Sequence, residues 1–410
     1  MMAREPEATR TLKLSARLGK IKPSLTLAVT AKAAALVRAG VDVIGYGAGE
    51  PDFDTPSHIK EAAKRALDAG ATKYTDVGGT PELRRAVAAW LNAAHGGLGL
   101  SEANILVSCG AKHSLYNLFQ ALLDEGDEVI IAAPYWVSYP EQVVMAGGTP
   151  VIVETRPEDG FLFSGAQLDA ACTPRTRALV LVSPSNPTGA VASRRHLTEI
   201  AEVCVQRNLL CISDDIYRSL VYGGAEYAQI ATLSPPMRER TLLIDGVSKT
   251  YAMTGWRIGF CAAPGELIRG MATMQGQSTS NPAAVSQAAA LAALTGPQDC
   301  VESMRREFDR RRVVMVERLR AMPGVACVEP RGAFYAFPDL RRCLGRRPPG
   351  GGIVDDDLAL AEYLLERARV AIVPGSGFGA PGFARLSYAT SLEKIETGLA
   401  RMHSALAELH

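Results

Sequence analysis

The sequence predicts an α/β fold in which a mostly parallel sheet is covered by helices on both faces and a smaller domain follows. From about residue 104, short and nearly all-apolar runs alternate with segments of helical spacing. This alternation is typical of a parallel sheet that is buried on both faces. From Pro297 onward the pattern changes to one long, charged helix and then to short strands. The length of 410 residues is sufficient for two or three structural units.

The first strand expected in the sheet is "NILVS", and the helical segment "GAKHSLYNLFQALLDEG" follows it. The next apolar runs are "DEVIIAAP", "PVIVET", "RALVLVSP", "LLCISDD" and "TLLIDG". Parallel sheets bind ligands at the carboxyl ends of their strands. The polar residues just after these runs are therefore candidates for a binding site: Asn186, Asp214 and Lys249.

The second domain is expected to begin with the connecting helix "QDCVESMRREFDRRRVVMVERLRAM". Short strands in "GVACVEP", "GAFYAFPDL", "VAIVPGSGFG" and "ARLSYA" follow, with a helix in "DDDLALAEYLLERA" and a loop at 346–352. An early helix, "TLAVTAKAAALVRAG", is expected to join this domain. We therefore predict an N-terminal arm and part of the small domain at 1–55, a large domain at 56–296 and a small C-terminal domain at 297–410.

Composition excludes several classes of function. Lys and Arg total 44 against 43 Asp and Glu, and this balance gives no field for binding nucleic acid. No run approaches about 20 apolar residues, and "MMAREPEATR" lacks the apolar core of a secretory signal. The eight cysteines form no C-x-x-C pair or metal-ligand cluster, which favours free thiols and no metal. We expect a cytoplasmic protein with neither a membrane nor a nucleic-acid partner.

The stretch "SKTYAMTGWRIG" places Lys249 among small, apolar and aromatic residues. A lone lysine in such a segment usually extends its amine to the surface. A lysine kept in a pocket of low dielectric constant instead has a lowered pKa and can attack a carbonyl. Pyridoxal phosphate is the commonest aldehyde partner of such a lysine. It requires a carboxylate for its pyridine nitrogen, N–H groups and a cation for its phosphate, and a flat partner for its ring.

The sequence contains a candidate for each requirement. Asp214 ends a strand in "ISDDIY", although a lone Asp there is more often a helix cap. Trp136 follows a strand in "APYWVSYP" and could stack on a ring, although it would more often be a core aromatic. Where a strand turns into a helix, free N–H groups and the helix dipole can hold a phosphate. The candidates for this phosphate site are Gly110, Ala111, Lys112 and Arg257.

The motifs "GAGEPDFDTP", "KYTDVGGTPELR", "PYWVSYPE", "SPSNPTGAV", "SDDIY", "SKTYAMTGWRIG", "PGSGFG" and "RLSYA" occur in this order. In this set the chain resembles the fold-type I, class I aminotransferases, in particular bacterial aspartate and aspartate/prephenate aminotransferases, from about Leu14 to Leu406. The resemblance implies a large domain with a mostly parallel seven-stranded sheet and a smaller α+β domain. It also implies pyridoxal 5'-phosphate as the cofactor.

The resemblance implies roles for individual residues. Lys249 matches the lysine that forms a Schiff base with the cofactor and moves the proton at the substrate α-carbon. Asp214 matches the partner of the pyridine nitrogen, and Asn186 and Tyr217 match the donors to the phenolate oxygen. Trp136 matches the stacking aromatic residue. Lys249, Asp214 and Tyr217 are therefore the expected catalytic residues.

The resemblance places the cofactor's phosphate on the backbone at Gly110, Ala111 and Lys112, together with Arg257. Tyr74 matches a tyrosine that reaches the phosphate of the neighbouring subunit, which implies a homodimer with shared active sites. Some relatives carry a phosphate-binding serine where this chain has Gly246, and Ser248 is the candidate to replace it. Asp215 stands where many relatives have glutamate, and we expect no consequence from that difference.

For the substrate, Arg385 matches the arginine that binds the α-carboxylate, with the backbone of Gly49 and with Trp136 and Asn186 nearby. The distal carboxylate of a dicarboxylic substrate is expected to meet three residues: Lys22, Thr26 and Lys112. The alternative for these is a solvated lysine at 22 and an ordinary cation at the start of a helix at 112. Their presence favours aspartate, glutamate and their 2-oxo acids, and leaves prephenate open.

Three classes of function follow from the sequence. The leading one is a transaminase that works by a ping-pong mechanism on an amino acid and a 2-oxo acid. A second is another enzyme with the same cofactor in a specialised pathway, which acts on a different amino acid or as a lyase or synthase. A third is a non-catalytic ligand sensor, but the short N-terminal arm has no room for a helix-turn-helix extension.

Overall fold

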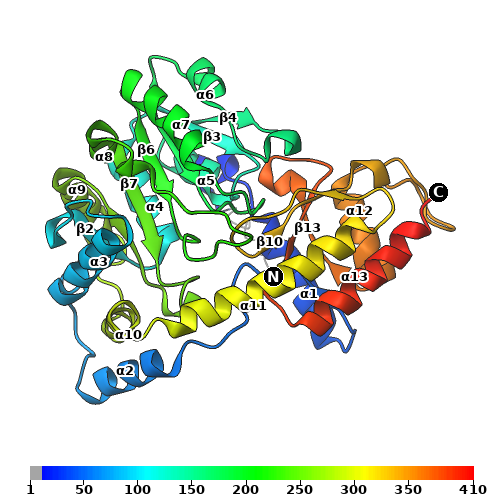
Figure 1. Ribbon diagram of the computed structural model, residues 1–410, viewed down its shortest axis with the longest axis horizontal. Helices are drawn as coiled ribbons and strands as arrows, with labels where there is room; N and C mark the ends of the chain where they lie inside the picture. The colour runs from blue at the N-terminus through cyan, green and yellow to red at the C-terminus, as the bar shows by residue number, and fades with distance from the viewer. Residues whose placement is uncertain (1–11) are drawn as a thin grey trace, which may run out of the picture.

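The computed structural model describes residues 12–410, and a seven-stranded sheet with the order β2-β8-β7-β6-β5-β3-β4 forms its centre (Figure 1). Neighbouring strands from β7 to β4 are parallel, whereas β8 runs antiparallel to both β2 and β7. The strands are β2 (Ile105–Ser108), β3 (Glu128–Ala133), β4 (Thr149–Glu154), β5 (Thr176–Val182), β6 (Leu210–Asp214), β7 (Thr241–Gly246) and β8 (Gly259–Ala262). The mostly parallel sheet predicted from the apolar runs is confirmed. The stretch "MMAREPEATR" lies outside the described residues.

Helices cover both faces of the sheet because the strands present apolar side chains to each side. On one face, Leu106 belongs to a core shared with α4 and α9, and on the other, Ile105 and Val107 belong to a core shared with α3 and α10. Beside the latter core, β5 packs with α6 and α7. The helices of this part are α2 (Ser57–Asp68), α3 (Pro81–Ala94), α4 (Ala111–Leu122), α5 (Ser138–Met145), α6 (Gly165–Ala171), α7 (Arg194–Gln206), α8 (Pro235–Arg240), α9 (Gly265–Gly276) and α10 (Ala284–Thr295).

The predicted connecting helix is α11 (Asp299–Arg320), which runs from α10 to the small domain at the right of Figure 1. The small domain contains β9 (Ala326–Cys327), β10 (Tyr335–Ala336), β11 (Pro338–Asp339), β12 (Val370–Ala371), β13 (Val373–Pro374), β14 (Ala384–Ser387), α12 (Asp357–Tyr363) and α13 (Leu392–Ala407). A π-helical turn, Leu364–Ala368, continues α12, so the expected single helix changes its winding.

The N-terminal arm packs on the small domain. Its β1 (Ile44–Gly45) pairs in parallel with β12, and α1 (Leu25–Arg38) contacts β13. Tyr46 donates its buried hydroxyl to the carbonyl oxygens of Lys394 and Ile395 in α13. We propose the division at 1–55, 56–296 and 297–410, and these contacts between the arm and the small domain support it.

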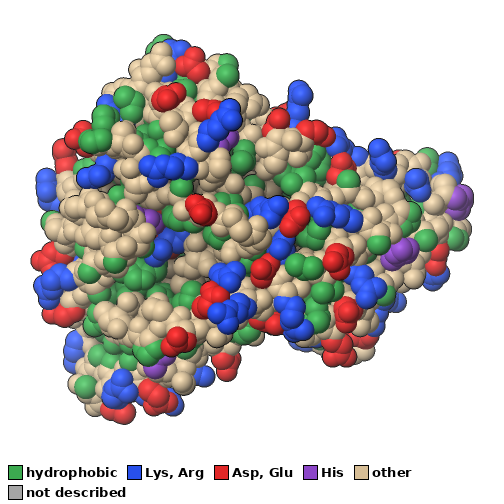
Figure 2. Space-filling model, viewed as in Figure 1, with side chains coloured by type: hydrophobic (Ala, Val, Ile, Leu, Met, Phe, Trp, Pro, Cys, Tyr) green, Lys and Arg blue, Asp and Glu red, His purple; other side chains and the backbone are tan. Residues whose placement is uncertain are grey.

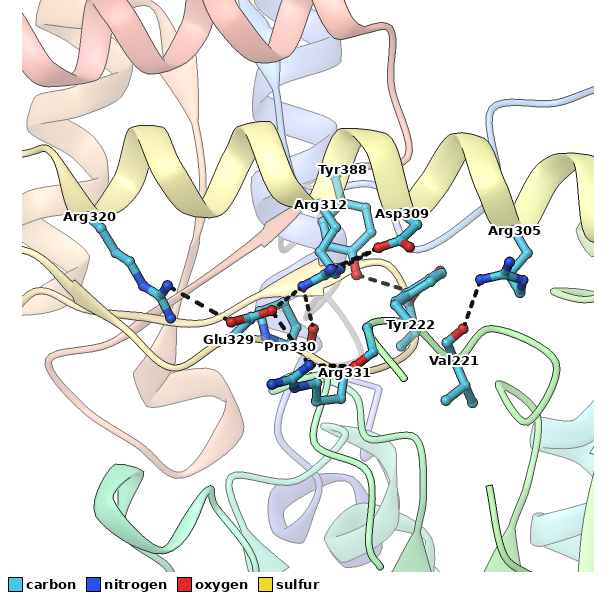
Figure 3. A network of polar contacts seen from close by, with 12 residues as sticks. Val221, Tyr222, Arg305, Asp309, Arg312, Arg320, Glu329, Pro330, Arg331 and Tyr388 are labelled. Carbon is cyan, nitrogen blue, oxygen red and sulfur yellow. Dashed lines mark hydrogen bonds and ion pairs between the residues drawn. The ribbon is translucent and has the colours of Figure 1, made fainter. Parts of the chain in front are cut away.

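A polar network joins α11 to the segment that enters the small domain (Figure 3). Arg312, which is 4% exposed, donates to Asp309 at 2.8 Å, to Glu329 at 2.7 Å and to the carbonyl oxygen of Pro330 at 3.4 Å. Arg331 donates in turn to the carbonyl oxygen of Gly223, in the large domain, at 2.8 Å. The network therefore fixes the chain at the point where it passes from one domain to the other.

Charges are mixed on the face shown in Figure 2, in keeping with the net charge of +1. Within residues 12–410, no helix combines the length and apolar character that crossing a membrane requires. No group of His, Cys, Asp or Glu in the same range is arranged to hold a metal ion. All eight cysteines are free, and five of them are buried.

Candidate active site

A cavity of about 480 Å³ lies at the carboxyl ends of β5 and β6, where the arm, the large domain and the small domain meet. The sequence predicted twelve of the residues that line it: Thr26, Gly49, Ala111, Lys112, Trp136, Asn186, Asp214, Tyr217, Ser248, Lys249, Arg257 and Arg385. Residues from all three predicted parts of the chain therefore contribute to a single site.

Lys249 is half-buried and donates from its Nζ to the carbonyl oxygen of Gly49 at 2.5 Å. Burial lowers the pKa of its amine to about 8, and the carboxylate of Glu50 partly opposes that effect. A lysine with a lowered pKa is partly neutral near physiological pH, which the attack of an amine on a carbonyl requires. The structure therefore places an amine of this kind in the cavity, as predicted.

Asp214, at the end of β6, is buried and accepts a hydrogen bond at 2.7 Å from the hydroxyl of Tyr139. Burial raises the pKa of Asp214 to about 6, while the bond from Tyr139 works in the opposite direction. Tyr139 lies one helical turn after Trp136, and the sequence analysis assigned it no role. The sequence feature that could have identified Tyr139 as a site residue is its spacing from Trp136. The carboxylate is therefore held by a donor from α5.

The amino end of α4 lies open to the cavity. Gly110, which caps it, has φ +91°, and no acceptor within residues 12–410 bonds the N–H groups of Ala111 or Lys112. A Cβ at Gly110 would lie 2.5 Å from Nη2 of Arg257, so only glycine allows the guanidinium to approach this closely. Arg257 itself donates only to carbonyl oxygens and forms no ion pair in this range. Free N–H groups, a helix dipole and an unpaired cation are suited to a phosphate.

Ser248 lines the same part of the cavity, whereas Gly246 lies in the sheet. A Cβ at Gly246 would come within 3.0 Å of the backbone of Gly259 and Ile258, so the serine of some relatives would need the chain to shift. Asp215 does not line the cavity and accepts a hydrogen bond from Ser213 at 2.9 Å.

Arg385, in β14, is 2% exposed. Its two Nη atoms donate to Oδ1 of Asn186 at 3.0 Å and to the carbonyl oxygen of Gly47 at 2.9 Å, while its Nε has no partner within residues 12–410. Burial lowers its pKa, and no carboxylate in the described residues pairs with it. A planar guanidinium that is fixed in this way can bind a carboxylate with two hydrogen bonds.

Trp136 and Lys112 both line the cavity, and Nζ of Lys112 lies over the ring of Trp136, 4.8 Å from its centroid. Burial, and to a lesser extent Arg257, lowers the pKa of Lys112. The buried Oγ1 of Thr26, in α1, has no hydrogen-bond partner among the residues that the structure describes. A cation and a free hydroxyl therefore lie in the same cavity as Arg385.

Two predicted residues lie elsewhere. The side chain of Lys22 does not line the cavity, although its backbone N–H donates to Glu141 at 2.8 Å. Tyr74 is 90% exposed and lines a separate surface hollow beside α10. Neither residue reaches the site within its own chain.

Comparisons with known protein sequences agree with the function that this geometry indicates. A family model described as "Aminotransferase class I and II" matches residues 41–402. The chain is 50% identical to an aspartate aminotransferase of Geobacillus stearothermophilus, over 96% of this chain and 98% of the relative. It is also 50% identical to an aspartate/prephenate aminotransferase of Cereibacter sphaeroides, over 97% of this chain and 99% of the relative.

Solved structures give the same result. The aspartate aminotransferase of Rhizobium meliloti matches with a TM-score of 0.93 and 44% identity, over 97% of this chain and 100% of the other. That of Thermus thermophilus with maleate matches with a TM-score of 0.90 and 46% identity, over 96% and 100%. The fold is therefore that of the fold-type I transferases.

The fold and the site define a transferase of amino groups, and the chain belongs to the class I and II aminotransferase family. Its cofactor is pyridoxal 5'-phosphate, and its substrates are amino acids and 2-oxo acids. The cavity fits this cofactor, because it combines open N–H groups at α4, the unpaired Arg257, the carboxylate of Asp214 and the amine of Lys249.

Proposed function

We propose that this enzyme moves the amino group between a dicarboxylic amino acid, aspartate or glutamate, and a 2-oxo acid by a ping-pong mechanism, and that prephenate is a further candidate substrate. The observation that carries the proposal is a cavity with two cations, Arg385 and Lys112, that form no ion pair within the described residues. A substrate with two carboxylates would satisfy both. The relatives named for aspartate and aspartate/prephenate, and the Thermus structure with the dicarboxylate maleate, support it.

When bound, pyridoxal phosphate supplies an aldehyde that takes up the amino group and a ring that accepts electrons from the α-carbon. We propose that Lys249 binds this aldehyde and moves the proton at the α-carbon. Asp214 would keep the ring nitrogen protonated, while Asn186 and Tyr217 would donate to the phenolate oxygen and thereby stabilise its charge. Trp136 would hold the ring by stacking.

The remaining groups hold the two ligands. The phosphate would bind at the amino end of α4 after Gly110, with Ser248 and Arg257 and with Tyr74 of a second subunit. Arg385 and the backbone of Gly49 would hold the α-carboxylate. Lys112, Thr26 and Lys22 would meet the distal carboxylate, and Lys22 would have to move toward the cavity to do so.

The substrate proposal is tested by comparing kcat/KM for aspartate and alanine in the wild type and in Lys112→Met. Loss of one charged hydrogen bond should lower the aspartate-to-alanine ratio by about 10- to 100-fold. The same measurement on Lys22→Met tests whether that lysine closes on the substrate. An unchanged ratio in both variants would remove these lysines from the distal site and leave the choice of substrate without a basis.

We also propose a cytoplasmic homodimer with shared sites. The exposure of Tyr74 outside its own cavity supports the dimer, because this side chain is then free to enter a partner's site. Sedimentation at micromolar concentration should give twice the mass of the chain, and a monomeric mass would contradict the shared site.

A further inference from the structure

Tyr335, in β10, lines the cavity, and the motifs of the sequence assign it no role. Its Oη lies 2.9 Å from Oη of Tyr217. Its ring centroid lies 4.5 Å from Cζ of Arg385. One buried side chain therefore touches the residue expected at the phenolate oxygen of the cofactor and the residue expected at the α-carboxylate of the substrate.

The direction of the hydrogen bond between Tyr217 and Tyr335 decides which hydroxyl can donate to a ligand. Burial raises the pKa of Tyr217 well above its ordinary value and also raises the pKa of Tyr335, so both hydroxyls are protonated at neutral pH. Each hydroxyl has one proton to donate and lone pairs with which to accept. If Tyr217 donates to Tyr335, its proton is no longer available to a ligand in the cavity. If Tyr335 donates to Tyr217, the proton of Tyr217 stays available for a hydrogen bond to that ligand.

The surroundings favour Tyr335 as the donor. Within residues 12–410 each of the two hydroxyls has only the other as its hydrogen-bond partner, but a bound cofactor would offer its phenolate oxygen as a second acceptor to Tyr217 and none to Tyr335, so the proton of Tyr335 is satisfied only by donation to Tyr217. The charge of Arg385 lowers the pKa of both tyrosines against the effect of burial, but the pKa of Tyr217 remains raised well above its ordinary value, whereas that of Tyr335 is raised less, so Tyr335 is the more acidic hydroxyl and the better donor.

The backbone before Tyr335 is held in an unusual conformation. Ala333 has φ +58°, in the left-handed region that costs a non-glycine residue free energy. Its N–H donates to the carbonyl oxygen of Leu220 at 2.9 Å, and its carbonyl oxygen accepts from the hydroxyls of Tyr222 at 2.5 Å and Tyr388 at 3.3 Å. These bonds fix the direction in which the chain carries Tyr335 toward the cavity.

We propose that Tyr335 is a positioning residue whose hydroxyl donates to Tyr217, so that Tyr217 donates to the phenolate oxygen of the bound cofactor, while the ring of Tyr335 supports Arg385. The proposal rests on the placement of the cofactor given under the proposed function. Aligned hydroxyl donors polarise one another, so Tyr217 becomes a stronger donor than it would be alone. Stabilising the phenolate in this way lowers the pKa of the visible chromophore of the holoenzyme.

The test is a pH titration of the visible absorption of the holoenzyme, without substrate, in the wild type and in Tyr335→Phe. Losing the donor should move the chromophore pKa upward by about 0.1 to 0.6 unit. A downward shift would show that Tyr217 donates to Tyr335 in the wild type and would overturn the proposal, as would an unchanged pKa. Since the titration uses no amino acid, it is independent of which substrate the enzyme prefers.

Two further variants separate the hydroxyl from the ring. Tyr222→Phe removes another buried hydroxyl, which bonds the carbonyl oxygen of Ala333, while the bonds of Ala333 to Tyr388 and Leu220 remain; it should lower the melting temperature and shift the chromophore pKa less than Tyr335→Phe does. Tyr335→Phe keeps a ring beside Arg385 and should leave KM for the amino donor within about twofold, whereas Tyr335→Leu should raise it about 3- to 10-fold. A pKa shift in Tyr222→Phe as large as that in Tyr335→Phe, or equal KM values in Tyr335→Phe and Tyr335→Leu, would count against these roles.

Discussion

Lys249 and Asp214 share a cavity in which burial disfavours the charged form of each side chain. The pKa of Lys249 falls to about 8 and that of Asp214 rises to about 6. In the cofactor-free protein each charge therefore costs free energy in the folded state. A bound cofactor that reacts with the amine and pairs with the carboxylate would relieve both costs, which couples its binding to stability.

The stability of the cofactor-free protein should carry the pH signature of Lys249. Between about pH 8 and 10.5 the unfolded chain binds the lysine proton and the folded chain has released it, so the free energy of unfolding rises with pH in this window. Lys249→Met removes the titrating group at similar length. Urea denaturation should show this variant more stable than the wild type by about 1–3 kcal/mol at pH 7. That advantage should shrink toward pH 10.5, and a constant difference would contradict the lowered pKa.

Arg385→Lys should weaken substrate binding. A lysine cannot keep both hydrogen bonds, to Asn186 and to Gly47, that orient the guanidinium, and it presents one point charge in place of a planar pair of donors. We expect kcat/KM to fall by about 10- to 100-fold, mainly through KM. Arg367→Lys, on the surface, is the matched control for steady-state kinetics. Equal KM values in the two variants would remove Arg385 from the substrate site.

Much of the site could be predicted because its residues directly follow strands. Asn186, Asp214 and Lys249 are brought together by the parallel sheet, whose strands end at one edge. Tyr335 could not be predicted from spacing, since it reaches Tyr217 from 118 residues away on a strand of two residues. The position of Lys22 depends on how the arm closes, which no local pattern specifies.

The amino end of α4 is the element on which the phosphate site depends, and β8 passes directly beneath it. A Cβ at Gly259, the first residue of β8, would lie 2.1 Å from the backbone nitrogen of Ala111. The close approach of strand and helix therefore sets where the free N–H groups of Ala111 and Lys112 point.

Gly259→Ala should separate α4 from β8 and weaken cofactor binding. We expect a stability loss of about 1–3 kcal/mol from overpacking, and a higher Kd for pyridoxal phosphate in an absorption titration. Gly255→Ala is the matched control, because a Cβ there meets nothing within 4 Å, and it should change stability by less than about 0.5 kcal/mol. Similar losses in both variants would show that the contact does not define the phosphate site.

The elements themselves were predicted unevenly. The strands of the large sheet and the charged helix α11 were recognisable because their apolar or helical patterns are long and regular. The strands of the small domain contain as few as two residues, as in β9 and β10, so their pairing depends on tertiary contacts that sequence patterns do not encode. The change from α12 to a π-helical turn likewise gave no signal in "DDDLALAEYLLERA".

At the scale of the molecule, the network of Arg312 joins the large domain, α11 and the small domain. Arg312→Met should leave Asp309 and Glu329 without their shared partner. Since both carboxylates are about one-third exposed and can be rehydrated, we expect a loss of about 1–3 kcal/mol, less than for a fully buried pair. Arg306→Met, whose side chain is 74% exposed, is the control in thermal denaturation. Equal melting temperatures would show that the network does not hold the domains.

The outward position of Tyr74 has a consequence for mixtures of inactive variants. In the proposed dimer, Lys249→Ala and Tyr74→Ala chains are each impaired at both sites. A hybrid dimer of the two chains has both substitutions in one active site, and its other active site contains only wild-type residues. Mixing the two preparations under conditions of subunit exchange should therefore restore up to about one quarter of normal activity per subunit. Random pairing makes about half of the dimers hybrids, and each hybrid has one active site of two.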